Sequence, residues 1–226
     1  MTTSRLGAYS FIVSSILLFI SGFLPGDIEK VGNILSIFGF CGIIYSTYAL
    51  CAYFRKEDKD NALLTLVPIL AIVGWSANAF GSALRIPLND TNIESVNAVA
   101  SMGGSLSATG GLSGFISTAL IGFYVFRKTS FSANNIYKII TILFVIASIA
   151  MLVMVSVFPL LVDGGREVAT AIGEPGDVKL TISTAILGAI WMSSMSIITI
   201  WTLSLIHISE PTRRTPSSYA VFCLKK

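Results

Sequence analysis

Six long, predominantly apolar stretches divide this chain, and their interiors contain no Asp, Glu, Lys, Arg or His. A bilayer core about 30 Å thick needs about 20 apolar helical residues to cross it. Only 12% of the residues are charged, against about 25% in an average soluble domain. The sequence therefore predicts an all-α fold, a polytopic transmembrane helical bundle. It excludes a soluble enzyme, a disordered chain and a disulfide-rich secreted module.

The six predicted spans are joined by short loops and form one transmembrane domain over residues 1–203. They cover residues 8–24, 31–54, 62–84, 106–126, 136–162 and 180–203. Pro25-Gly26 is a pair that ends helices, and it follows the first span directly. An alternative for this first stretch is a cleaved signal peptide with Arg5 as its basic region. No small-residue cleavage site supports that alternative.

The approach to the fourth span is the least apolar part of the predicted bundle. Residues 101–111 are mostly Gly, Ser, Ala and Thr, a composition with poor helix propensity. Thr91 and Glu94 just before it have the spacing of a capping box. We expect a short interfacial helix there, a break near Gly103-Gly104, and then the span. A re-entrant loop over residues 101–111 is the alternative.

The distribution of Lys and Arg predicts the orientation, because short cytoplasmic loops carry an excess of both. With the N-terminus inside, the inner segments hold seven basic residues and the outer loops hold four. The inner set is Arg5, Arg55, Lys56, Lys59, Arg127, Lys128 and Lys138, and the outer set is Lys30, Arg85, Arg166 and Lys179. Both termini are therefore predicted to be cytoplasmic, in a plasma or inner membrane.

The sequence lacks the residues on which most catalysis and cofactor binding depend. Gly111-Leu112-Ser113-Gly114 in the fourth span resembles the GxSG serine motif of rhomboid intramembrane proteases. Those enzymes use a histidine on their sixth span as general base, and the sixth span here has none, so Ser113 has no route to activation. We expect no catalytic residue, no cofactor and no metal site. A lipid-directed enzyme using Asp163 and Glu167 is a distant alternative.

A few polar side chains within the spans are the candidate functional residues. Asn78 is the most polar of them and is expected to hydrogen-bond a neighbouring helix. Ser76, Ser113 and Thr184 lie on the third, fourth and sixth spans. Small residues also recur every four positions in the fourth span, as in Gly110 and Gly114, which is typical of close helix packing. These residues pack helices together, or they line a cavity between spans three, four and six.

The last 23 residues differ from the rest of the chain. Residues 204–226 resemble translated sequencing-adapter or read-through sequence and are predicted to be a non-native tail. Without them, eleven basic and eleven acidic residues remain, so no basic surface for nucleic acid is expected. Cys41 and Cys51 are predicted to be buried thiols about 15 Å apart along one helix, too far for a disulfide. Asn89-Asp90-Thr91 matches an N-glycosylation acceptor pattern.

Two functions from different classes follow from these observations. The first is a non-catalytic integral membrane protein, expected from a metagenomic source, that acts as a subunit or packing partner. Its expected partners are the lipid bilayer and a second copy or another membrane subunit. The alternative is a transporter or channel for a small neutral or weakly polar solute. Residues 1–203 resemble no functional family.

Overall fold

A computed structural model describes residues 3–22, 24, 29–56, 58–86, 94–129, 135–157 and 186–198. All the elements among them are helices, and these described ranges contain no strand. The elements are α1 (Thr3–Ser21), α2 (Glu29–Phe54), α3 (Leu63–Arg85), α4 (Glu94–Thr129), α5 (Asn135–Met151) and the π-helix η3 (Leu152–Val157). A further apolar helix covers Ile186–Ile198. The predicted all-α class is confirmed.

Four helices are long and apolar enough to cross a membrane. They are Lys30–Phe54, Leu63–Arg85, Ser101–Lys128 and Asn135–Val157. The apolar helices Tyr9–Ser21 and Ile186–Ile198 are shorter within the described residues. Residues 204–226, Asn89, Asp163 and Glu167 lie outside the described residues, as does the C-terminal part of the predicted sixth span.

The predicted break near Gly103-Gly104 is wrong, and so is the re-entrant alternative over residues 101–111. α4 is one helix of 36 residues that runs through both glycines. Packing explains the difference, because Gly103 lies against the backbone of Gly81 on α3. Tertiary contact here overrides the low helix propensity of glycine. At 1.5 Å per residue the helix is about 54 Å long, so it extends beyond a 30 Å hydrocarbon core.

The most extensive contact between two helices is that of α3 with α4, and glycine makes it close. A Cβ atom on Gly74 would lie 2.6 Å from the carbonyl oxygen of Gly110, and one on Gly110 would lie 2.7 Å from that of Gly74. Two helical turns further along α3, a Cβ on Gly81 would lie 2.6 Å from the carbonyl oxygen of Gly103 on α4. The two backbones therefore touch at two levels, which confirms the predicted packing role of the small residues in α4.

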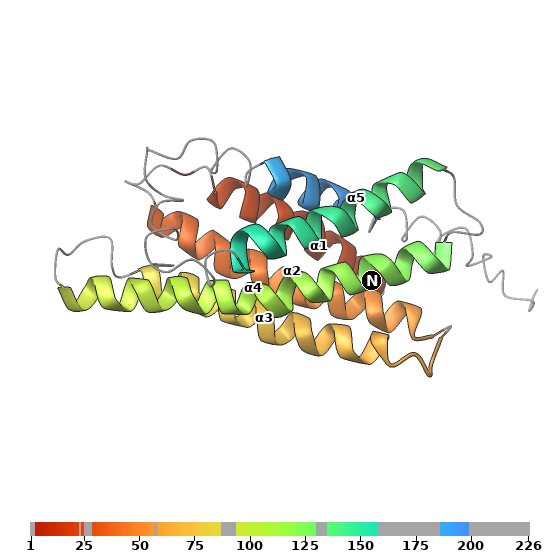
Figure 1. The fold of residues 1–226 in the computed structure, drawn as a ribbon, viewed down its shortest axis with the longest axis horizontal. Coiled ribbons are helices and arrows are strands. Elements are labelled where there is room, and N and C mark those ends of the chain that lie inside the picture. The colour runs from red at the N-terminus through yellow and green to blue at the C-terminus, as the bar shows by residue number, and fades with distance from the viewer. Residues whose placement is uncertain are drawn as a thin grey trace, which may run out of the picture.

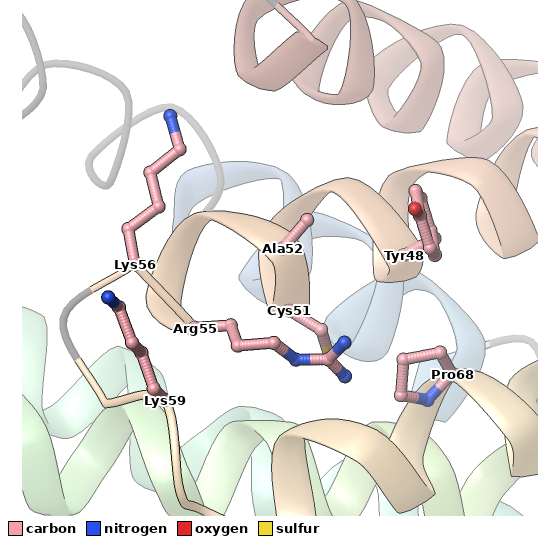
Figure 2. A pocket seen from close by; sticks show the side chains of 7 residues that line it. All are labelled: Tyr48, Cys51, Ala52, Arg55, Lys56, Lys59 and Pro68. Carbon is pink, nitrogen blue, oxygen red and sulfur yellow. The ribbon is translucent and has the colours of Figure 1, made fainter.

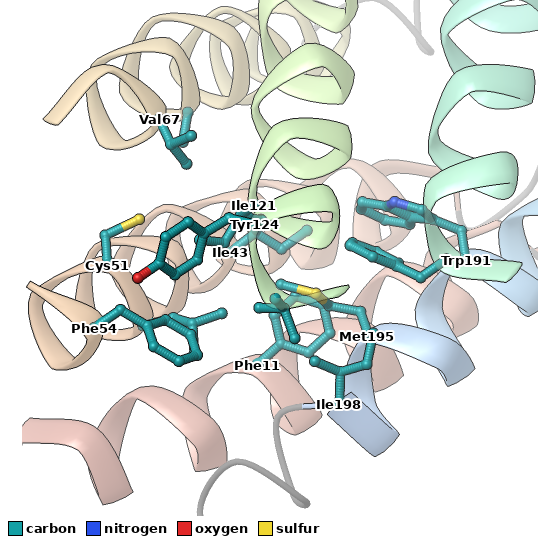
Figure 3. Close-up of a cluster of buried hydrophobic side chains, with 14 of the residues drawn as sticks. Phe11, Ile43, Cys51, Phe54, Val67, Ile121, Tyr124, Trp191, Met195 and Ile198 are labelled. Carbon is teal, nitrogen blue, oxygen red and sulfur yellow. The ribbon is translucent and has the colours of Figure 1, made fainter. Parts of the chain in front are cut away.

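Consecutive helices run in alternating directions along the long axis of the molecule, which is horizontal in Figure 1. α1 packs on α2, where the hydroxyl of Ser10 donates to the carbonyl oxygen of Gly42 at 3.1 Å. α2 packs on α3, and α4 packs on α5. Ile186–Ile198 returns to α1, since the hydroxyl of Ser196 lies 3.4 Å from that of Ser15. Figure 3 shows the core where Phe11, Ile43 and Met195 from three of these helices meet.

The exposed surface of the bundle is apolar, whereas many buried side chains carry a hydroxyl. On α5 the outward positions are Ile136, Ile139, Ile142, Leu143, Ile146 and Ile149. Its inward face holds Thr141 and Ser148, both fully buried, whose hydroxyls donate to the carbonyl oxygens of Tyr137 and Phe144. A water-soluble helix would carry polar residues at these outward positions. The apolar outward face fits a chain whose solvent is lipid.

The prediction that Cys41 is buried is wrong. Cys41 is exposed and Cys51 is buried, and both are free thiols. Cys41 lies on the outward face of α2 together with Val31, Ile34 and Phe38, at intervals of three and four residues. The thiol is therefore on the apolar outer surface of the bundle.

Replacing Gly74 with Ala is expected to lower the free energy of unfolding by about 1–3 kcal/mol, because the added methyl group overpacks the α3–α4 contact. Gly104→Ala is the matched control, since a Cβ there would have only the Arg85 guanidinium within 4 Å, at 3.4 Å. The control should be neutral or slightly stabilising, as alanine favours the helix. Unfolding in detergent, followed by circular dichroism, measures both, and equal effects of the two substitutions would contradict the backbone contact.

Candidate functional site

Asn78, the most polar residue of the predicted spans, lies buried where α3 meets α4. Its Nδ2 donates to the carbonyl oxygen of Gly74 at 3.1 Å, within its own helix. The structure thus shows this bond within α3, and the hydrogen bond to a neighbouring helix stays a prediction. On α4, Gly110 lies next to this side chain, since a Cβ on Gly110 would lie 3.2 Å from Nδ2.

The structure describes two of the other three candidate residues, Ser76 and Ser113. Ser76 is half-buried on α3. Ser113 is half-buried on α4, and its hydroxyl donates to the carbonyl oxygen of Gly110 at 3.3 Å. Thr184 lies outside the described residues. On the α3–α4 side, the space expected to form a cavity is filled by the glycine contact.

Five aromatic rings instead occupy the centre of the bundle, one from each of five helices. Trp75 of α3 stacks on Phe40 of α2 at 5.6 Å between ring centroids, and it meets Phe115 of α4 edge-on at 5.1 Å. Trp191 lies 5.7 Å from Trp75 and 6.5 Å from Phe144 of α5. Offset and edge-on aromatic pairs each add about 0.5–1.5 kcal/mol beyond burial. The rings therefore connect five helices at one level.

The two tryptophans at this centre differ in their polar atoms. Nε1–H of Trp191 donates to the hydroxyl of Ser148 at 3.0 Å. Nε1–H of Trp75 is buried without a hydrogen-bond partner, and so is the hydroxyl of Ser156 on η3. Buried donors are nearly always satisfied in proteins. These two groups, on elements that both contact α4, are unexplained by packing alone.

At the loop end of the α2–α3 hairpin, an arginine compensates for a proline inside α3. Pro68 lies inside α3 and has no N–H, so the carbonyl oxygen of Leu64, four residues earlier, has no helical donor. The guanidinium of Arg55 donates to that oxygen at 2.6 Å and to the hydroxyl of Thr65 at 3.3 Å. The carbonyl that Pro68 leaves without a helical donor is thus satisfied by Arg55, the residue that follows α2.

Arg55 also lines a cavity of about 480 Å³ between the ends of α2 and α3. Figure 2 shows its guanidinium between Cys51 and Pro68, while the Lys56 and Lys59 side chains extend from the connecting loop. Tyr48 and Ala52 complete the lining. Composition gave no signal for this site, because the loop 55–60 carries equal numbers of basic and acidic residues. In the described part of this loop, the basic residues line the cavity and Asp58 bonds Tyr124 of α4.

No protein-family model, curated protein or solved structure matches this chain. The described residues also contain no cluster of three or more His, Cys, Asp or Glu placed to hold a metal ion. The site must therefore be interpreted from the geometry of its own residues.

Arg55→Ala is expected to cost about 1 kcal/mol of unfolding free energy, because the carbonyl of Leu64 loses its donor. In a Pro68→Ala background the same substitution should cost much less, since residue 68 regains an N–H that bonds Leu64 within the helix. A double-mutant cycle on unfolding in detergent measures this coupling. Lys56→Ala is the control, and equal costs of Arg55→Ala in both backgrounds would refute the pairing.

Proposed function

We propose that this chain is a non-catalytic, multi-pass integral membrane protein that acts as a subunit or packing partner within the bilayer. The observation that carries the proposal is the apolar outer surface of the bundle. Large Ile, Leu, Val and Phe side chains are exposed on every described membrane-length helix, while several Ser and Thr side chains are fully buried. In lipid, such an outer surface needs no further covering by protein, and it is free to contact another transmembrane helix.

The proposal includes six spans, with α1 and Ile186–Ile198 completing the four longer helices, and cytoplasmic termini. The alternating direction of the helices supports this topology, because it gathers the basic residues at one end. Tyr124, three residues before Arg127 on α4, donates to Asp58 in the α2–α3 loop at 3.3 Å. The two loops richest in Lys and Arg thus lie on one side, as the positive-inside rule requires.

The buried polar groups support a structural role rather than catalysis. Ser117, Thr118, Thr141 and Ser148 are fully buried and donate to carbonyl oxygens of their own helices. A hydroxyl bonded in this way satisfies its own donor and adds no reactive group. Ser113 follows the same pattern, so its motif needs no catalytic explanation.

A subunit or packing partner should be found in an assembly larger than the 24.1 kDa monomer. We expect the protein, extracted from native membranes with a mild detergent, to migrate on a native gel as a discrete complex containing a second copy or another membrane protein. Mass spectrometry of the excised band identifies the composition. A detergent-stripped sample in SDS is the control, and a monomer alone in several mild detergents would contradict the role.

Transport of a small neutral or weakly polar solute is the second candidate. The unpaired Nε1–H of Trp75 and hydroxyl of Ser156 favour it, because each is a buried donor from which a solute bound next to it would accept. Reconstituted liposomes should then show solute uptake above empty liposomes, and Asn78→Leu should lower it severalfold. Ser105→Ala, at an exposed position of α4, is the control. Absence of flux for glycerol, urea, sugars and neutral amino acids would exclude this candidate.

A further inference from the structure

The cavity between α2 and α3 has one charged side and one apolar side. Arg55, Lys56 and Lys59 supply the charged side (Figure 2). Tyr48, Cys51, Ala52 and Pro68 supply the other. A cavity of about 480 Å³ is large enough for a headgroup. Its two-sided lining matches a ligand that is itself anionic at one end and apolar at the other.

No described carboxylate is paired with the three cations of the cavity. Among the described residues, none of Arg55, Lys56 and Lys59 forms an ion pair, and both lysines are exposed. Arg55 uses one guanidinium nitrogen for Leu64 and Thr65. A guanidinium has five N–H donors, so donors remain for a phosphate oxygen.

The nearest described acid is turned toward another helix. Asp58 accepts from Nδ2 of Asn61 at 3.0 Å and from the hydroxyl of Tyr124 on α4 at 3.3 Å. Asp60 is exposed and does not line the cavity, and Glu57 lies outside the described residues. Among the described residues of this loop, the three basic side chains therefore line the cavity, while Asp58 is held against α4.

The position of the cavity, at the end of two apolar helices, favours a lipid over a free anion. The apolar stretch of α2 ends at Phe54 and that of α3 begins at Leu63, on either side of the cations. This is the level at which the hydrocarbon core gives way to phosphate headgroups. Toward the core, Ile69 and Ile72 of α3 are about half exposed, next to Pro68 in the cavity wall. An acyl chain has an apolar surface to follow there.

From these observations we infer that the α2–α3 cavity binds the headgroup phosphate of an anionic phospholipid. Lys56 and Lys59 neutralise the phosphate, the unused donors of Arg55 hydrogen-bond it, and the acyl chains lie along α3. The inference rests on the membrane placement above and is independent of the subunit role. The predicted orientation makes this the cytoplasmic face, where anionic lipid creates a negative surface potential.

Native mass spectrometry of the full chain in detergent tests this inference with two lipids of identical acyl chains, a phosphatidylglycerol and a phosphatidylcholine. The wild type is expected to retain phosphatidylglycerol in preference. Lys56→Gln with Lys59→Gln should weaken that binding at least tenfold, because each basic residue near an anionic surface contributes about fivefold. Phosphatidylcholine binding should not change. Arg55 is left in place, since Leu64 depends on it.

Arg127→Gln with Lys128→Gln is the matched control, because it removes the same charge from the same end of the bundle outside the cavity lining. It should change phosphatidylglycerol binding less than twofold. Three results would overturn the inference: equal retention of both lipids, equal loss in the two double variants, or full displacement of the lipid by inorganic phosphate at matched ionic strength. The last would identify an anion site without lipid selectivity. Circular dichroism checks that both variants are folded.

Discussion

The backbone contact between α3 and α4 is the constraint on which the rest of this structure depends. Gly74 and Gly110 let the helices meet without intervening side chains, and Gly114 one turn further gives Trp75 its place: a Cβ there would lie 3.0 Å from the indole ring. Trp75 in turn contacts rings from α2, α4 and Ile186–Ile198. A methyl group at one of these glycines would therefore displace the aromatic centre as well as the helix pair.

A second constraint is that a chain in lipid must satisfy its polar groups internally. Most buried hydroxyls do so by donating to a carbonyl three or four residues earlier, as Thr118 does to Phe115. Pro68 leaves the carbonyl oxygen of Leu64 without a helical donor, and Arg55, the residue that follows α2, donates to it. The α2–α3 hairpin is thereby joined at its loop end by a charge-assisted hydrogen bond. The same bond positions the Arg55 guanidinium in the wall of the cavity.

Apolar run length was sufficient to predict the helical class and the bounds of α2 and α3 within two residues, because lipid leaves few alternatives for such segments. It failed at Gly103 and Gly104, where propensity indicates a break but contact with α3 keeps the helix intact. The site was harder to predict. Asn78 attracts attention in the sequence, yet its bond is local. In the sequence, Arg55 is one of several basic loop residues, and only the fold shows that it lies beside Leu64.

α4 is continuous over 36 residues, and its contact with α3 lies near its middle. From Gly110 the helix extends about 24 Å to Glu94 in one direction and about 28 Å to Thr129 in the other. The glycine contacts at Gly103 and Gly110 therefore hold α4 near its middle, and both of its ends extend beyond them. The bond of Tyr124 to Asp58 joins one of these ends to the α2–α3 loop. One continuous helix thus connects that loop to the Glu94 end of the bundle.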